Sequence, residues 1–302
     1  MASSPIEEHA LRLIWSLWTE LGVPGLDRHH AHVALDLEPI VLYSPMVALR
    51  DARLVGQIEA WCLAHATVIS VTRLRGLLGQ APEEAATAFS QIAAALNRDH
   101  SLGWPEIEAV EPSARVPPSK PPPIWLARPA LQRIRFRALA GIGARADVIC
   151  ELLARSPQWS IAASLVELGY TKRNIARILS ELVSSGFCDE YVQGTTLNVR
   201  LNSQWVQRLT DTSTLAWPRW IPLFQLVDTL LRLVGISNKP STVRRVGAHK
   251  AREEAASLGL NLGLPPPPPT RGVPEAWDLM MAWGETQLAA LADGTSPAFQ
   301  RR

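Results

Sequence analysis

The chain has 302 residues, of which 47% are hydrophobic and 19% charged, enough for ordinary packed cores and for two or three domains. Its three cysteines are scattered and form no CxxC pair, which argues against a disulfide framework and against a cysteine-rich zinc site. The N-terminus has no signal-peptide pattern, and the most lipid-like stretch, residues 220–236, is interrupted by Asp228 and Arg232. We therefore expect a soluble, cytoplasmic protein that makes no membrane contact.

The net charge of +2 conceals a gradient along the chain. Residues 1–123 carry 9 basic and 14 acidic side chains, a net charge of −5. Residues 124–202 carry 10 and 6 (+4), and residues 203–302 carry 11 and 8 (+3). A basic middle would suit a chain that offers this part to DNA, although an ordinary scatter of surface charge would give the same values.

The N-terminal part predicts a mainly helical domain over residues 1–111. Ser4 is a capping residue followed directly by proline, and Glu7 lies three residues after the cap, so a helix begins here and ends before Gly22. Apolar spacing predicts the further elements: helices over residues 53–65 and 82–97, a short helix within 67–78, and either a strand or a helix over 32–44.

Two proline tracts divide the chain. Residues 112–129 contain seven prolines in 18 residues, which cannot supply a helix or a central strand and predict a stiff linker. Residues 265–269 form the second tract, ahead of a predicted final helix over 275–292. Such tracts can also be ligands for aromatic-lined peptide grooves. The predicted organisation is a helical domain over 1–111, a linker over 112–129, a central domain over 130–202 and a helical C-terminal region over 203–302.

The central domain begins with two predicted helices. Residues 144–155 place their apolar side chains on one face of a helix. Ser160 is predicted to cap a second, shorter helix, whose apolar residues recur at helical spacing up to Leu168. Gly169 can take the left-handed conformation that a tight corner between helices often needs.

A third helix and a hairpin follow. Thr171 is predicted to cap a helix over residues 172–184, and Gly186 to end it. Residues 187–192 and 197–201 then flank a short turn, with apolar and polar side chains alternating in the second strand. Helix, helix, turn, helix and two-stranded wing is the order of a winged helix-turn-helix.

The stretch LGYTKRNIARILSELVSSG, residues 168–186, resembles the turn, recognition helix and exit of bacterial winged helix-turn-helix transcriptional regulators of the arsenic-sensor and multiple-antibiotic-resistance repressor families. Together with the order of elements around this stretch, the resemblance covers about 65 residues, from about 135 to 202, roughly a fifth of the chain. It implies a mainly α fold with a central winged helix, double-stranded DNA as the partner, and a homodimer on a two-fold operator.

The face of the third helix that is left outside predicts the DNA contacts. Arginine can form two hydrogen bonds to guanine and asparagine two to adenine, which assigns base reading to Arg173, Asn174 and Arg177. Lys172 would hold the DNA backbone. The full predicted DNA-binding set is Thr171, Lys172, Arg173, Asn174, Arg177, Ser180 and Arg200.

The wing departs from the pattern of these families. Its first strand carries Asp189 and Glu190, and only Arg200 is basic, whereas family wings usually carry cations that grip DNA. Either this wing points away from DNA or the domain binds a protein. The alternative function is therefore a protein-interaction module, such as an antitoxin or a scaffold, whose winged helix docks a protein partner.

No enzymatic site is predicted. Residues 29–38 hold three histidines together with Asp36 and Glu38, but no HExxH helix or other metal spacing accompanies them, and a solvated loop is the interpretation adopted. Residues 141–147 begin like a phosphate-binding GxGxxG loop but end in aspartate and follow no strand. We expect no catalytic residue, no cofactor and no metal.

The C-terminal region carries a basic stretch, residues 239–252, which is either a second phosphate-contacting surface or the polar side of a helix answered by Glu253 and Glu254. Four tryptophans beyond the winged helix are expected to make subunit or domain contacts: Trp217, Trp220, Trp277 and Trp283.

Overall fold

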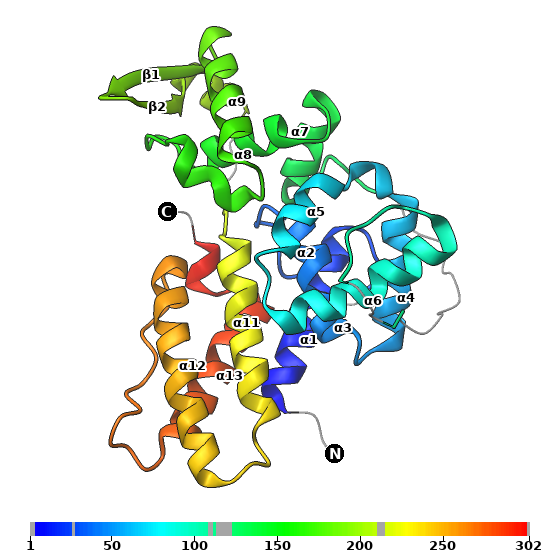
Figure 1. Cartoon of the computed structure of the whole chain (residues 1–302), viewed down its shortest axis with the longest axis vertical. Coiled ribbons are helices and arrows are strands. Elements are labelled where there is room, and N and C mark those ends of the chain that lie inside the picture. Colours follow the sequence, from blue (N-terminus) through cyan, green and yellow to red (C-terminus); the bar gives the residue numbers. More distant parts are fainter. Residues whose placement is uncertain (1–3, 26–27, 108–110, 113–122, 210–214, 301–302) are drawn as a thin grey trace.

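The computed structural model describes residues 4–25, 28–107, 111–112, 123–209 and 215–300. These residues are mainly helical and include one two-stranded antiparallel sheet, which confirms the predicted fold class. In Figure 1 the winged helix lies at one end of the molecule, the helices α11, α12 and α13 form a bundle at the other, and the N-terminal helices lie beside them.

Six helices make up the N-terminal region. They are α1 (Pro5–Glu20), α2 (Leu37–Tyr43), α3 (Pro45–Ala48), α4 (Ala52–Ala64), α5 (Val71–Leu78) and α6 (Glu83–His100), with the 3-10 turn η1 (Ala66–Val68). The start of α1 is confirmed, because the backbone N–H of Ser4 donates to the Glu7 carboxylate at 2.9 Å. Residues 32–44, which fitted either a strand or a helix, contain the helix α2. Every residue of α2 is buried, so its apolar residues show no periodicity that distinguishes a helix from a strand.

The C-terminal region contains three long helices. They are α11 (Trp220–Gly235), α12 (Ser241–Leu262) and α13 (Ala276–Ala292), followed by the 3-10 turn η4 (Pro297–Phe299). Within the described ranges, no helix combines the length and apolarity that a bilayer crossing requires. Two residues of the basic stretch have acidic partners on α12 itself: His249 lies 3.3 Å from Glu253, and Lys250 lies 4.0 Å from Glu254.

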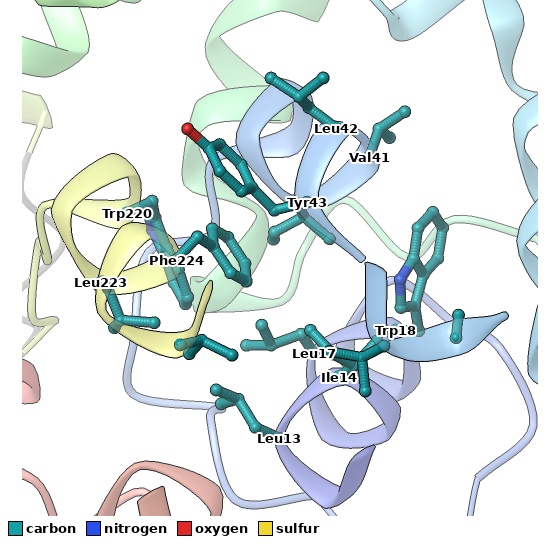
Figure 2. Close-up of a cluster of buried hydrophobic side chains, with 14 of the residues drawn as sticks. Leu13, Ile14, Leu17, Trp18, Val41, Leu42, Tyr43, Trp220, Leu223 and Phe224 are labelled. Atoms are coloured by element: carbon teal, nitrogen blue, oxygen red, sulfur yellow. The ribbon is translucent and has the colours of Figure 1, made fainter. Parts of the chain in front are cut away.

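The N-terminal and C-terminal regions share one hydrophobic core. Figure 2 shows where α1, α2 and α11 meet, and the ring of Tyr43 stacks on that of Phe224 with centroids 5.3 Å apart. The indole of Trp220 donates to the carbonyl of Ala34 at 2.8 Å, a contact between the two regions. Because these segments share one large core, we call them together the body. The domain boundaries themselves stay a prediction.

Both proline tracts contact the body where the structure describes them. Of the tract at 112–129, residues 113–122 lie outside the described part of the chain. Its end leads into the 3-10 turn η2 (Pro129–Leu131), where the carbonyl of Ala130 accepts a hydrogen bond from the Leu35 N–H at 2.8 Å. The second tract connects α12 to α13, and its Pro268 carbonyl accepts from Arg252 at 3.2 Å. The described parts of both tracts therefore lie against the body.

The winged helix has a core of its own. Its elements are α7 (Gln132–Ala140), α8 (Ala144–Arg155), η3 (Ala162–Leu168), α9 (Lys172–Ser184), β1 (Cys188–Gln193) and β2 (Thr196–Leu201), followed by α10 (Ser203–Leu209). The predicted bounds of α8 and α9 are confirmed, and so is the hairpin, whose register runs from Cys188 opposite Leu201 to Gln193 opposite Thr196.

The predicted cap at Ser160 is wrong. Ser160 exchanges two backbone hydrogen bonds of 2.8 Å with Val199 and so extends the wing by one bridge. The helix begins after it, at Ala162, and is a 3-10 helix. The side chain of Ser164 makes the local hydrogen bonds at its start, donating to the Ile161 carbonyl at 2.9 Å. The Ser160 hydroxyl makes no capping hydrogen bond, and the pairing of its backbone with Val199 is a tertiary contact that local sequence does not show.

The predicted solvated loop at residues 29–38 is only partly right. His32 is exposed, but His30, Asp36 and Glu38 are buried, and the ring of His30 joins two helices. Its Nδ1 lies 2.8 Å from the Ser16 hydroxyl on α1, and its Nε2 lies 2.8 Å from the Leu291 carbonyl on α13. Burial lowers the pKa of His30 to about 4.

This burial predicts a loss of stability in mild acid. As pH falls from 6.5 towards 4, the unfolded chain binds a proton at His30 and the folded chain does not, so the free energy of unfolding falls. Between about pH 7 and about pH 4.5 we expect a loss of about 2–3 kcal/mol from this group. Urea unfolding of the wild type and of His30→Gln measures it. A variant that loses as much stability as the wild type over this range would contradict the assignment.

Candidate nucleic-acid interface

Helix α9 is fixed by local signals that the sequence contains. Gly169 precedes it with a φ of +86°, and the Thr171 hydroxyl accepts a hydrogen bond from the Asn174 N–H at 3.3 Å. Four apolar side chains at positions i, i+3, i+4 and i+7 are buried against the rest of the winged helix: Ile175, Ile178, Leu179 and Leu182. One face of α9 is therefore committed to the core and the opposite face is free for a partner.

The predicted DNA contacts on α9 lie on this outer face. Thr171, Lys172, Arg173 and Ser180 are exposed, and Asn174 is half-buried. The Arg177 side chain is 60% exposed, but it is not unpaired, because it donates to Asn174 Oδ1 at 3.0 Å and forms an ion pair with Glu181. The structure thus leaves five of these six side chains exposed and Asn174 half-buried, with Arg177 already engaged.

Two charged residues at this surface were missed from the sequence. Glu181 pairs with Arg177 and also with Arg145 at the start of α8. The hydrogen bond from Arg145 lowers the pKa of the Glu181 carboxyl. The pair of Arg177 and Glu181 could have been predicted, because residues four apart on a helix are neighbours. The contact of Arg145 with Glu181 depends on the packing of α8 against α9 and could not be predicted from the sequence.

Arg200 is separate from this surface and is held by the wing. Its guanidinium donates to Asp189 at 3.2 Å and lies 4.5 Å from the ring centroid of Trp159. Trp159 in turn meets Tyr191 edge to face at 4.7 Å. Asp189 therefore neutralises the one basic residue of the wing.

The corner of the helix-turn-helix is docked against α5 of the body. Arg73 Nε donates to the carbonyl of Leu168 at 2.8 Å. Gly76 faces the carbonyl of Gly169 so closely that a β-carbon at Gly76 would lie 2.1 Å from that oxygen. Only glycine permits this approach of two backbones. This contact of Gly169 with the body therefore lies three residues before Lys172, the first residue of α9.

A buried ionic network surrounds this contact. Arg73 of α5 donates to Asp36 Oδ2 at 2.7 Å and to Glu38 Oε2 at 2.8 Å, both carboxylates at the start of α2. Arg137 of α7 donates to Glu38 at 2.6 Å and to Asp147 of α8 at 2.9 Å. Glu38 thus accepts from arginines of both the body and the winged helix and ties the two together.

The hydroxyl of Tyr170 completes the network at the corner. It donates to Asp147 Oδ2 at 2.7 Å. Burial by itself would raise the pKa of Asp147, but the guanidinium groups of Arg137 and Arg73 hold it below its ordinary value. Burial also opposes ionisation of Asp36, and Arg73 again outweighs it and holds that pKa well below its usual range. Both carboxylates are therefore charged at neutral pH.

Comparison of the chain with protein-family models, with curated proteins and with solved structures finds no match. The resemblance of residues 168–186 to bacterial winged-helix regulators therefore rests on the residues themselves and on the order of elements. The DNA-contacting roles stay predictions.

Arg137→Met tests the ionic network. The substitution removes one of the two arginines that pair with the buried carboxylates of Glu38 and Asp147, and we expect the free energy of unfolding to fall by about 3–5 kcal/mol. Arg145→Met removes an arginine whose side chain is 51% exposed from the same domain and should cost less than about 1 kcal/mol. Urea unfolding at neutral pH compares them, and equal losses would mean that the buried network does not bear on stability.

Gly76→Ala tests the close approach at the corner. The new β-carbon would meet backbone rather than a movable side chain, so we expect a loss of about 1–3 kcal/mol. Gly79→Ala is the matched control three residues on, with a φ of −66° and nothing within 4 Å, and should be neutral or stabilising by about 0.4–1 kcal/mol. Thermal unfolding of both variants measures the two changes in stability. A Gly76→Ala variant as stable as the wild type would contradict the close contact.

Proposed function

We propose that this chain is a DNA-binding transcriptional regulator whose helix α9 enters the major groove of double-stranded DNA. The observation that carries the proposal is the outer face of α9, where Lys172 and Arg173 are exposed opposite a fully buried apolar face. A recognition helix needs this division, because it must be held by a core while its first turns reach base edges and phosphates. The absence of a membrane-crossing helix among the described residues is compatible with this function.

The paired state of Arg177 refines the roles of these residues. Arg173 and Asn174 are the leading base readers, and Lys172 and Thr171 are suited to phosphate. Arg177 must exchange Glu181 for a base before it can form two hydrogen bonds to guanine, so its net contribution is smaller than that of Arg173. Arg200, held on Asp189, is the weakest candidate of the predicted set.

The resemblance extends the proposal in two respects. Regulators of this kind bind two-fold operators, so we expect a homodimer, and they act in the cytoplasm. Both expectations rest on the analogy alone.

A protein partner for the wing is the second candidate function. Trp159, Tyr191 and Val192 are exposed large side chains on or beside the wing, at 38%, 42% and 65%. Such a surface with Asp189 and Glu190 beside it repels phosphate and suits a protein, as in a scaffold or an antitoxin. The two functions are compatible, because α9 and the wing tip carry different surfaces.

The test is binding to the DNA upstream of the chain's own gene, against scrambled DNA, across a salt series. We expect the wild type to prefer the upstream DNA and Arg173→Ala/Arg177→Ala to lose about 10- to 100-fold of that preference, since one good arginine–guanine pair is worth about 1–3 kcal/mol. Fluorescence anisotropy with labelled duplexes measures it.

Arg98→Ala/Arg271→Ala is the matched control for this test. It removes two exposed arginines from parts of the chain away from α9, so it changes the net charge equally and should keep the preference. If both double variants weaken binding equally, only a diffuse basic surface is involved. No binding at low salt would refute the DNA proposal and leave the protein partner.

A further inference from the structure

The segment that connects α12 to α13 runs along the outside of the C-terminal bundle, where Figure 1 shows it as an orange connection. It contains the second proline tract, residues 265–269, followed by Thr270 and Arg271. The described residues 264–270 belong to no helix or strand. Proline has no backbone N–H to donate, so such a run is suited to the extended polyproline II helix, which needs no internal hydrogen bonds.

The burial of this segment repeats every three residues. Three residues at this spacing are buried: Leu264, Pro267 and Thr270. Pro268 is half-buried, and the remaining residues up to the arginine are exposed: Pro265, Pro266, Pro269 and Arg271. A period of three is that of the polyproline II helix, whereas an α-helix repeats at 3.6 residues and a strand at 2. The segment therefore has one buried edge and two edges that are open to solvent.

Hydrogen bonds hold the buried edge in place. The Leu264 N–H donates to the Gly259 carbonyl at 2.9 Å at the start of the segment. Arg252 of α12 donates to the Pro268 carbonyl at 3.2 Å, and the Thr270 hydroxyl lies 3.1 Å from His249 Nδ1. A segment that is already extended and fixed loses little conformational entropy when a partner binds it.

The two open edges carry the order PxxPxR, with Pro266, Pro269 and Arg271 at its fixed positions. Domains of the SH3 kind bind PxxP segments of polyproline II conformation in grooves lined by aromatic side chains. A groove that covers both open edges would contact five residues: Pro265, Pro266, Pro268, Pro269 and Arg271. The two positions that it would leave out, Pro267 and Thr270, are the ones buried on the chain itself.

Arg271 places a positive charge at one end of this surface. Its side chain is exposed and can therefore be reached by a carboxylate of a partner. Arginine can bind a carboxylate through two parallel hydrogen bonds, which adds geometric specificity to the contact. An acidic side chain at one end of the groove would thus fix the direction in which the segment binds.

We propose that residues 265–271 are the binding segment for a protein domain of the SH3 kind. Its aromatic-lined groove takes the exposed prolines, and an acidic side chain at the end of the groove pairs with Arg271. This surface lies on the C-terminal bundle, whereas α9 and the wing lie at the other end of the molecule (Figure 1). The proposal is therefore independent of DNA binding and of a protein partner at the wing.

Calorimetric titration of the full chain with a purified SH3 domain that binds PxxPxR peptides tests the segment. We expect saturable binding. The same domain with its groove tryptophan replaced by alanine should bind about 10- to 100-fold more weakly, because the proline rings lose the aromatic surface on which they pack. No saturable binding at domain concentrations up to about 1 mM overturns the proposal.

Two variants and their matched controls locate the site on the chain. Pro269→Ala removes one proline ring and Arg271→Gln removes the charge, and each should weaken binding about 10-fold. Pro274→Ala and Arg245→Gln make the same changes at exposed positions outside the segment and should bind as the wild type does. Circular dichroism checks that each variant is folded.

The variants separate the two parts of the proposal. Unchanged binding in Pro269→Ala, or an equal loss in Pro274→Ala, would mean that the domain does not recognise this segment and overturns the proposal. Unchanged binding in Arg271→Gln overturns the pairing of Arg271 with an acidic side chain of the groove.

Discussion

The fold depends on a group of buried charges between the winged helix and the body. Its members are four carboxylates and three arginines: Asp36, Glu38, Asp147, Glu151, Arg73, Arg133 and Arg137. Removing these groups from water costs several kcal/mol per ion, so the network is weak evidence for net stability. Its consequence is geometric. Apolar surfaces can slide past one another, whereas hydrogen-bonded ion pairs are satisfied in one arrangement only.

Because of this constraint, the body helps to fix the orientation of α9. The described residues pack into two main hydrophobic cores, one of the body and one of the winged helix, and the ionic network lies between them. Other contacts between the two units add to it, among them Ile134 of α7 in the core of the body and the pair of Arg219 with Glu167. With Arg73 on the Leu168 carbonyl and Tyr170 on Asp147, the residues on both sides of Gly169 are fixed to the body and to α8. The direction in which α9 faces is therefore a property of the whole chain.

Local signals predicted the winged helix well. The Thr171 cap, the left-handed Gly169 and the apolar spacing of α9 act within a few residues, so they can be read along the chain. Signals that act across the fold could not be read. The apolar face of a helix does not indicate which other element it packs against, so the sequence did not predict that α1 and α11 share a core. Asp36 and Glu38 were noticed as carboxylates, but their arginines lie 35 or more residues away in the chain. The strand pairing of Ser160 has the same origin.

The helix-turn-helix corner is held from two distant parts of the chain at adjacent residues. Arg219 binds the side chain of Glu167, and Arg73 binds the carbonyl of Leu168. The first contact is partly exposed and borders a cavity, and the second is buried within the ionic network. Solution molecules can therefore reach only the first. The corner before α9 is therefore held by one buried contact and one partly exposed contact, and a change at the exposed contact can reach α9 both through Gly169 and through the packing of η3 and α8 against α9.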